Sequence, residues 1–282
     1  MWNNLFLMTV HAIHQAIACK CRLWGMAVES VKTALKVLEA VVETPLVGVS
    51  ELARRLNEPK TTVQRCLTTL HEAGYVRPVG DQRRRWAVTN RLLLLSKTAN
   101  AEPRLREVAL PVMRWLRDQT RETIHLMVPE GGEVVLIERI DSPQPVRTVR
   151  QLGAHAPLHI ASNGKAALAA LSEADREAYY RTPLMSWTKN TITTADRLRQ
   201  EIAKVQQDGY AVSMGELDSE VHAVAAAILD KDGRLIATMS ISCPASRLPQ
   251  ELVPKYGALV VKAAKRIGQN LQSADDAIGS AA

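Results

Sequence analysis

Residues 51–86 constrain the fold of this chain more than any other stretch. They read ELARRLNEPKTTVQRCLTTLHEAGYVRPVGDQRRRW, two short helical patterns followed by a glycine and then by three arginines before a tryptophan. Val63, Leu67 and Leu70 recur at the spacing of one helical face, and Gly74 is well placed to end that helix. The stretch therefore predicts a helix that packs through these three side chains.

Two further helices are expected before it. The first covers residues 30–43, SVKTALKVLEAVVE, and its spacing predicts a core-facing side formed by Val31, Leu35, Leu38 and Val42. The second begins at Ser50 as the N-cap and ends near Asn57. Two helices separated only by the short connection at Glu58-Pro59 have helix-turn-helix spacing.

The outer face of the last of these helices carries hydroxyls, an amide and cations. A recognition helix points such side chains, and the free N–H groups of its first turn, at base edges and phosphates. We therefore predict that this face contacts double-stranded DNA. The residues expected to do so are Lys60, Thr61, Thr62, Gln64, Arg65 and Thr68.

A basic hairpin is expected next. The runs YVRPV and RRRWAV flank Gly80-Asp81, which is a turn signal between two strands. Such a hairpin beside a helix-turn-helix forms a wing. Its arginines, Arg83, Arg84 and Arg85, are predicted to lie on the sugar-phosphate backbone or in a minor groove.

The charge distribution supports a polyanion-binding module joined to a neutral domain. Residues 26–100 hold 12 lysines and arginines against 7 acidic residues, whereas residues 101–282 hold 22 of each. The chain of 282 residues is 46% apolar, yet no stretch of 18 or more residues is continuously apolar. We expect a globular protein of two domains with no membrane span.

The cysteines and the two ends of the chain carry little fold information. Four cysteines, at positions 19, 21, 66 and 243, are too few and too scattered for a disulfide framework, which favours a reducing cytoplasm. Residues 1–25 lack a positively charged start and are expected to be an extension outside the fold. Residues 273–282 are expected to be a disordered tail.

Residues 91–121 are expected to form linker helices, with Pro111 starting a new helical segment or kinking the old one. Residues 122–272 then alternate strand and helix patterns and predict one α/β domain. Its expected strands include TIHLMV, EVVLIERI and PVRTVRQ, and the pair VHAVAAAIL and RLIATMSIS forms a hairpin. Helices are expected at GKAALAAL, after Ser172, and from Thr194 to Gly209.

Polar residues of this second domain suggest a small-molecule site. Ser162-Asn163-Gly164 opens a helix, where exposed N–H groups favour a carboxylate. Ser240 and Ser242 alternate along the last strand and should share one face, as should Val221, Ala223 and Ala225 on the strand before it. We expect these segments to converge on one cavity.

The order of these segments resembles the IclR family of bacterial transcriptional regulators. The resemblance runs from about Ser30 to Gln272 and includes SVKTALKVLEAV, VSELARRLNEPKTTVQRCLTTLHEAGYV, REVALPVMRWL, PLHIASNGKAALA and GYAVSMGELDSEVHAVAAAILDKDGRLIATMSISCPASRL. It implies an α+β two-domain chain: a winged helix-turn-helix over residues 26–90, the linker helices, and an α/β effector-binding domain resembling the GAF fold. It also implies homodimers or homotetramers on DNA that respond to a small metabolite.

The resemblance places the effector site on the same segments and on the loop SMGELD. The expected effector is a small organic acid or aromatic carboxylate. The expected contacts are Thr148, Ser162, Asn163, Gly164, Ser213, Glu216, Asp218, Val221, Ala223, Ser240 and Ser242. We expect no cofactor, no metal and no catalytic residue, since no Gly-x-Ser-x-Gly elbow and no metalloenzyme His spacing is present.

Three other classes of protein compete with this interpretation. A hydrolase would use Ser240 or Ser242 with His222 and Asp218. A metal-sensing or metal-storage protein would use three histidines and two carboxylates: His155, His159, His222, Glu216 and Asp218. A purely structural dimerisation protein would need neither site. Binding to duplex DNA from the chain's own upstream region separates the regulator from all three.

Overall fold

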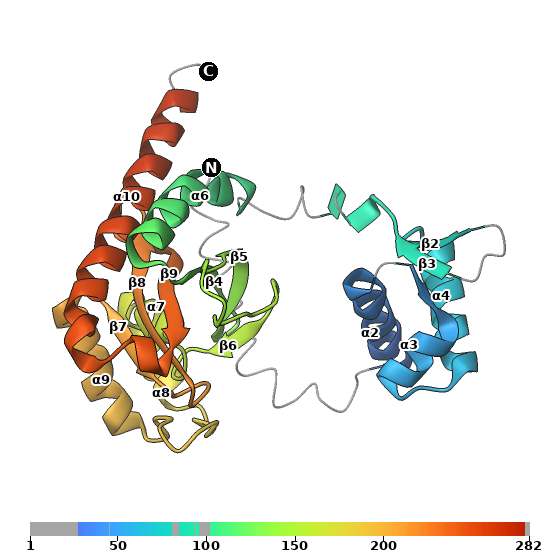
Figure 1. Ribbon diagram of the computed structural model, residues 1–282, viewed down its shortest axis with the longest axis horizontal. Helices are drawn as coiled ribbons and strands as arrows, with labels where there is room; N and C mark the ends of the chain where they lie inside the picture. The colour runs from blue at the N-terminus through green and yellow to red at the C-terminus, as the bar shows by residue number, and fades with distance from the viewer. Residues whose placement is uncertain (1–27, 45, 81–84, 93, 96–101, 280–282) are drawn as a thin grey trace. The chain divides into compact units, whose positions relative to one another are not determined.

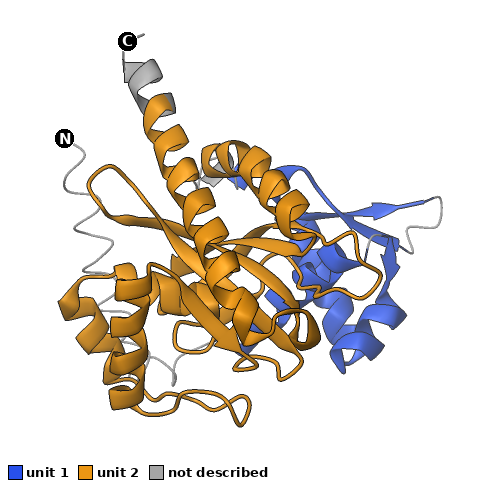
Figure 2. Ribbon diagram, turned by 60° about the vertical axis from the view of Figure 1, so that its left-hand side comes forward, with its two compact units in different colours: residues 1–101 blue, residues 102–282 orange. Residues whose placement is uncertain are grey.

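The computed structural model describes residues 28–44, 46–80, 85–92, 94–95 and 102–279. The chain divides into two compact units, residues 1–101 and residues 102–282, which Figure 2 draws in different colours. The first unit corresponds to the DNA-binding region expected from the sequence. The expected linker, residues 91–121, is divided between the two, because its long helix belongs to the second unit.

Up to residue 88, the described part of the first unit combines three helices with a small antiparallel sheet (Figure 1). The order along the chain is helix, strand, helix, helix and hairpin, and the strands pair in the order β1-β3-β2. The elements are α2 (Glu29–Glu43), β1 (Val47–Gly48), α3 (Val49–Leu56), α4 (Lys60–Glu72), β2 (Val76–Val79) and β3 (Arg85–Val88). This is the winged helix-turn-helix that the sequence predicts.

The core of the first unit is formed by all three helices and the hairpin. Val63 and Leu67 of α4 have no exposed surface, and they pack in one cluster with Leu52 of α3 and Trp86 of β3. Gly74 follows α4 with a φ of 80°, in the left-handed region that favours glycine. The prediction of the α4 core face and of its glycine stop is confirmed.

The predicted core face of α2 was wrong for three of its four residues, and only Leu38 packs against the core, partly buried. Its buried side chains are Thr33, Val37, Ala40 and Val41. Val31, Leu35 and Val42 are 50–55% exposed. Two apolar stripes run along this helix, and the tightly packed one carries the smaller residues, which let α2 lie close to α4. Ser50 is likewise inside α3 rather than its N-cap, which is Gly48.

The second unit is a six-stranded antiparallel sheet with helices on both faces (Figure 1). Its strands pair in the order β6-β5-β4-β9-β8-β7. The strands are β4 (Thr123–Glu130), β5 (Glu133–Ile140), β6 (His155–Pro157), β7 (Ala211–Met214), β8 (Val221–Leu229) and β9 (Leu235–Pro244). The helices are α6 (Glu102–Thr120), α7 (Ser162–Ala170), α8 (Glu173–Tyr180), α9 (Ala195–Asp208) and α10 (Val253–Gly279), with short 3-10 turns at Ala245–Arg247 and Gln250–Leu252.

Alternation along β9 separates the two layers of this unit. Met239, Ile241 and Cys243 are buried in the cluster formed with α6 and α10. Ser240 and Ser242 point to the other side of the sheet, where α7 lies. The period-2 pattern therefore places one apolar face under the two long helices and one hydroxyl-bearing face toward α7.

Four local predictions in this unit can be compared with the structure. Ser172 caps α8 by accepting a hydrogen bond from the Asp175 N–H at 3.2 Å, and Gly209 ends α9 with a φ of 79°. The predicted strand at residues 145–151 is wrong, because this segment is irregular and the strand beside β5 is β6. Pro111 lies inside α6, which continues past it. No helix in the described ranges is long and apolar enough to cross a bilayer.

Candidate DNA-binding face and ligand cavity

The outer face of α4 is polar and accessible. Lys60, Thr61, Gln64, Arg65 and Thr68 are exposed and Thr62 is half-buried, opposite the buried Val63, Leu67 and Leu70. The N-cap of α4 is Pro59, and no side chain caps its first turn. The N–H groups of that turn are therefore available to an anion. Thr68 donates to the Gln64 carbonyl at 3.0 Å, so its hydroxyl faces its own helix backbone.

The cations of this face are free to meet an external anion. Among the residues that the structure describes, Arg55 pairs with Glu43, whereas Lys60 and Arg65 have no carboxylate partner. Arg85 is exposed on β3 and donates to the Leu46 carbonyl at 3.4 Å, a contact that leaves its charge uncompensated. Arg83 and Arg84 lie outside the described residues.

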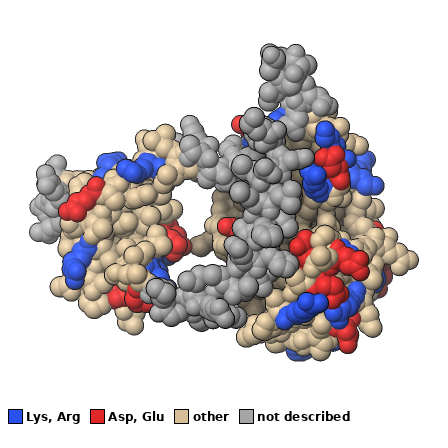
Figure 3. Space-filling view, turned by 180° about the vertical axis from the view of Figure 1, so that it is seen from behind, with Lys and Arg blue, Asp and Glu red and all other residues tan. Residues whose placement is uncertain are grey.

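The second unit contrasts with this face in charge. Figure 3 shows basic and acidic side chains interspersed on the visible surface of that unit. Surface pairs such as Arg199 with Glu177, at 2.9 Å, neutralise each other there. This pattern agrees with the even count of basic and acidic residues in residues 101–282. On the face that Figure 3 shows, the described residues of the second unit therefore form no broad basic surface of the kind that duplex DNA attracts.

The second unit contains a cavity of about 760 Å³ on the α7 side of the sheet. Strands β4, β7, β8 and β9 form its floor, and the first turn of α7 closes one side. Loops at residues 146–150, 217–220 and 244–246, together with Trp187, form the remaining walls. Its volume suits a small organic molecule.

Most of the predicted effector contacts lie together in this cavity. Gly164 and Glu216 do not line it. Gly164 packs against the Leu158 backbone so closely that a Cβ would lie 2.5 Å from the Leu158 Cα. The predicted residues that do line it are Thr148, Ser162, Asn163, Ser213, Asp218, Val221, Ala223, Ser240 and Ser242.

Glu216 belongs to a buried ion-pair cluster behind the cavity wall. Lys165 of α7 has no exposed surface, and its Nζ lies 2.7 Å from Glu216 Oε1 and 2.9 Å from Glu201 Oε1. Burial raises the pKa of Glu216, while the Lys165 ammonium opposes that change. The cluster joins α7, α9 and the segment after β7, so it fixes the wall from which Asp218 reaches the cavity.

Hydrogen bonds hold the hydroxyls of the cavity floor. Asn163 Nδ2 donates to Ser240 Oγ at 2.7 Å. Thr148 Oγ1 lies 3.2 Å from both the carbonyl and the hydroxyl of Ser242. Ser213 donates to the Ile160 carbonyl at 3.2 Å. These side chains are all at most 9% exposed, so the floor is polar, uncharged and ordered by its own bonds.

Sequence reasoning missed several residues of the cavity. His125 of β4 is 4% exposed and borders it, and Arg147, Arg150 and Trp187 form part of its walls. Burial, together with the Arg150 and Arg139 guanidinium groups, lowers the pKa of His125 to about 3, so its imidazole is neutral at pH 7. Trp187 is 54% exposed although it is a large apolar side chain. No sequence motif marks these positions.

The wall that carries the two arginines has both signs of charge. Arg150 is half-buried, and burial lowers the pKa of its guanidinium, although Asp218 opposes the shift. Asp218 and Glu220 line the same cavity. The walls thus offer cations for an acidic ligand, whereas the floor offers only neutral groups.

The competing site models are not assembled by the fold. His222 pairs in register with Cys243, and Ser242 pairs with Ala223, so His222 points to the opposite face of the sheet from both serines. His159 contacts the Tyr179 hydroxyl at 2.8 Å, and His155 lies 3.4 Å from Glu133. Within the described ranges, no group of three or more metal-ligating side chains is found.

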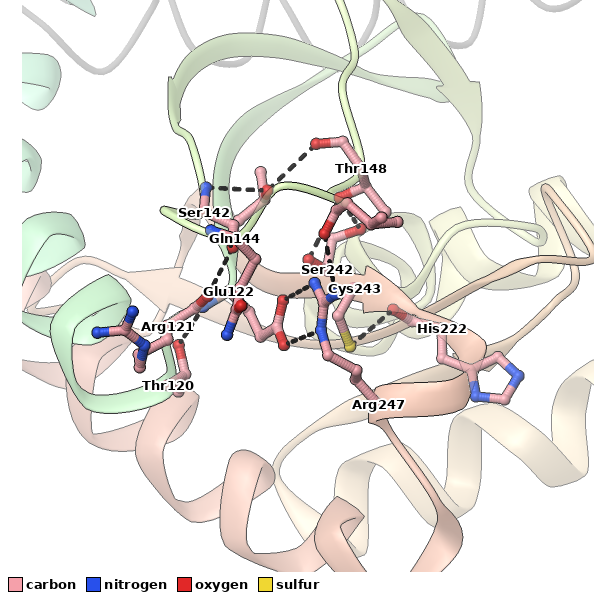
Figure 4. A network of polar contacts seen from close by, with 12 residues as sticks. Thr120, Arg121, Glu122, Ser142, Gln144, Thr148, His222, Ser242, Cys243 and Arg247 are labelled. Carbon is pink, nitrogen blue, oxygen red and sulfur yellow. Dashed lines mark hydrogen bonds and ion pairs between the residues drawn. The ribbon is translucent and has the colours of Figure 1, made fainter.

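A polar network ties the cavity to the end of α6 (Figure 4). Glu122, two residues after α6, is 3% exposed and accepts two hydrogen bonds of 2.6 Å from Arg247. Arg247 also donates to the Val146 carbonyl at 2.9 Å. Thr123 donates to the Thr148 carbonyl at 3.1 Å, and Ser142 donates to the Arg121 carbonyl at 2.6 Å. The loop that carries Thr148 is therefore fastened to the end of α6.

A winged helix-turn-helix with an open polar helix, followed by a domain with an internal polar cavity, defines a ligand-responsive transcriptional regulator. Family models give the same result. The model described as bacterial transcriptional regulator IclR C-terminal matches residues 98–269, and the IclR helix-turn-helix domain matches residues 30–80. The chain belongs to the IclR family of DNA-binding transcriptional regulators with a C-terminal effector-binding domain.

Individual relatives agree over nearly the same range. The transcriptional repressor IclR of Escherichia coli K12 is 30% identical over 244 residues, which cover 85% of this chain and 89% of that protein. The crystal structure of the Thermotoga maritima IclR matches with a TM-score of 0.70 and 27% identity, over 86% of this chain and 98% of that one. An IclR homologue from Microbacterium hydrocarbonoxydans, crystallised with 4-hydroxybenzoate, matches with a TM-score of 0.70 and 25% identity. The match covers 86% of this chain and 99% of that one.

Proposed function

We propose that α4 is the recognition helix of this regulator and that it lies in the major groove of an operator. The main support is that one face of α4 is buried, whereas its opposite face is exposed and carries hydroxyls, an amide and cations. Lys60, Thr61 and Thr62 would meet phosphates and base edges at its N-terminal end, with Gln64 and Arg65 beside them. Thr68 is at the far edge of this face. Arg85, with Arg83 and Arg84, would contact the backbone.

The DNA contacts are tested by comparing two arginines. Arg65→Ala should weaken binding to the specific site by about 1–3 kcal/mol and relax its sequence preference, because a base contact is lost. Arg85→Ala should weaken specific and random duplexes alike and reduce the salt dependence. Fluorescence anisotropy with the upstream region of the gene and with a shuffled duplex measures both. If Arg65→Ala weakened binding to the two duplexes equally, the proposal that α4 lies in the major groove would be wrong.

We also propose that the cavity binds a small organic acid or aromatic carboxylate. The first turn of α7 begins at the cavity wall with no capping side chain, so its N–H groups can receive a carboxylate. Arg147 and Arg150 add positive charge. The relative crystallised with 4-hydroxybenzoate makes that compound a rational first probe. Thermal shift of the full chain against a panel of acids should show stabilisation that rises with concentration, and Arg150→Gln should weaken it.

The signal is proposed to pass through the network of Figure 4. A ligand that contacts Thr148 changes the position of a loop that Glu122, Thr123 and Arg247 hold against the end of α6. Since α6 follows the DNA-binding unit in the chain, two loop positions can favour two DNA affinities. Arg247→Ala should therefore reduce the effect of the acid on DNA binding more than it reduces acid binding itself. If Arg247→Ala reduced acid binding and the effect of the acid on DNA binding equally, Arg247 would have no part in transmitting the signal.

The chain is proposed to act in the cytoplasm as a homodimer or homotetramer on a near-palindromic operator, with repression or activation as its output. Helix-turn-helix proteins read two half-sites through a two-fold axis. The exposed apolar stripe of α2, formed by Val31, Leu35 and Val42 and continued by its N-cap residue Val28, supports a self-association surface. Sedimentation of the full chain should give a dimer or larger, and Leu35→Glu should shift it toward the monomer.

A further inference from the structure

Two buried polar atoms of the cavity have no hydrogen-bond partner among the described residues. They are Asn163 Oδ1 and His125 Nε2. Both side chains are 4% exposed, and both border the same cavity. A buried polar atom left unbonded destabilises the fold, so two of them in one small cavity need a physical explanation.

The two side chains lie on either side of Ser240. His125 of β4 is directly opposite Ser240 of β9 in the antiparallel register, so their side chains share one face of the sheet. Asn163 reaches Ser240 from the first turn of α7 with its 2.7 Å hydrogen bond. The unbonded atoms therefore belong to one patch of floor, formed by His125, Asn163 and Ser240.

A bare carboxylate cannot satisfy the unbonded Asn163 Oδ1 of this floor patch. A carboxamide oxygen only accepts hydrogen bonds, and an ionised acid only accepts them too. The neighbouring imidazole is neutral, because burial and the two nearby guanidinium groups disfavour its cationic form. The group that satisfies Asn163 Oδ1 must carry a hydrogen to donate. A hydroxyl does so and keeps its lone pairs for an Nε2–H of His125.

We propose that the acid bound in this cavity carries a hydroxyl group, which donates to Asn163 and accepts from His125. The inference rests on the proposed function of the cavity and adds the ligand class, a hydroxylated organic acid. Asn163 and His125 are then the residues through which the protein distinguishes the hydroxylated acid from the same acid without the hydroxyl. The acid group is bound elsewhere in the cavity, at the α7 N–H groups or the arginines, so the two ends of the ligand are recognised separately.

Matched ligand pairs test this class on the unaltered chain. Benzoate with 3- and 4-hydroxybenzoate, and propionate with 2- and 3-hydroxypropionate, differ only by the hydroxyl. Isothermal titration should show that at least one hydroxylated member binds about tenfold or more tightly than its parent, since sites built around a hydrogen bond discriminate strongly against analogues that lack it. The comparison needs no variant, so it does not depend on a variant folding.

Two variants assign the discrimination to the floor patch. Asn163→Ala should reduce the preference for the hydroxylated member to within about threefold of unity, because the acceptor that distinguishes the two members of a pair is removed. His125→Gln, which retains a polar side chain, should reduce the preference in part. Ser213→Ala is the matched control, because Ser213 also lines the cavity but its hydroxyl is already bonded to Ile160. It should change both members of a pair by the same factor.

The possible outcomes distinguish a failure of the hydroxyl inference from a failure of the proposed acid-binding function. Parent and hydroxylated acids that bind with equal affinity would overturn the hydroxyl assignment and leave the acid-binding cavity standing. A hydroxyl preference that survives Asn163→Ala would overturn the role of Asn163. No binding by any of these acids would count against the organic-acid proposal and against the hydroxyl inference that rests on it.

Discussion

The outer face of α4 and the cavity of the second unit both use hydroxyls, amides and cations, but they place them in opposite environments. On α4 these groups are exposed on one continuous stretch of helix. In the cavity the hydroxyls and the amide are buried, the arginines stand on a loop wall, and all of them come from strands, a helix turn and loops far apart in the chain. Exposed polar groups contribute little to folding and can be selected for binding alone, whereas buried ones affect both.

The largest expected effect on stability comes from replacing one lysine in each unit. Lys165→Met leaves Glu216 and Glu201 without the ammonium that joins them, and loss of one partner from a buried pair lowers the free energy of unfolding by about 3–5 kcal/mol. Lys60→Met, on the open face of α4, should change it by less than about 0.5 kcal/mol. Urea unfolding of the full chain measures both. Similar effects of the two substitutions would break the contrast.

The pH dependence of stability gives a smaller effect. The pKa of His125 is about 3 in the folded chain against an ordinary value of 6.5, so the unfolded chain binds a proton more readily. Stability is therefore fully present above pH 6.5 and is lost as the pH falls toward 3. One such group contributes a loss of about 2 kcal/mol between pH 7 and pH 5.

His125→Gln should remove that part of the slope, and the exposed His71→Gln on α4 should retain it. Urea unfolding at pH 7, 6 and 5 provides the comparison. An unchanged slope in His125→Gln would mean that other groups, not the buried cavity imidazole, set the acid sensitivity.

The smallest expected effect concerns the end of α4. Gly74 has a φ of 80°, and a Cβ there would lie 3.3 Å from the Arg91 guanidinium. Gly74→Ala should lower the free energy of unfolding of the first unit by about 1 kcal/mol. Gly74→Asn should lower it less, because asparagine tolerates left-handed backbone better. Thermal unfolding measures both variants. If Gly74→Ala lowered the stability no more than Gly74→Asn does, the left-handed backbone at the end of α4 would not be the source of the loss.

The first unit could be predicted from sequence because its signals are local. The spacing of Val63, Leu67 and Leu70 defines the buried face of α4, and Gly74 defines its end, so the polar face follows without any tertiary information. The same reasoning failed for α2. Its two apolar stripes are equally helical, and only packing against α4 decides that Val37 and Val41 are buried and Leu35 is not.

The cavity was predictable only in part. Ser240 and Ser242 could be placed on one face by strand alternation, and Ser162 and Asn163 by the start of a helix. His125 could not be found, because it enters the cavity through the pairing of β4 with β9, which no local pattern encodes. Glu216 was misplaced for a related reason. Its partner Lys165 lies on α7, and that long-range ion pair turns the carboxylate away from the cavity wall.

The central claim is that the open face of α4 reads a specific duplex. The most direct test measures the affinity of the full chain for its own upstream DNA and for a shuffled duplex of equal composition, over a range of salt concentrations. We predict that the upstream DNA binds at least about a thousandfold more tightly and that both affinities fall steeply as salt rises. Equal affinity for the two duplexes, or an affinity insensitive to salt, would contradict it.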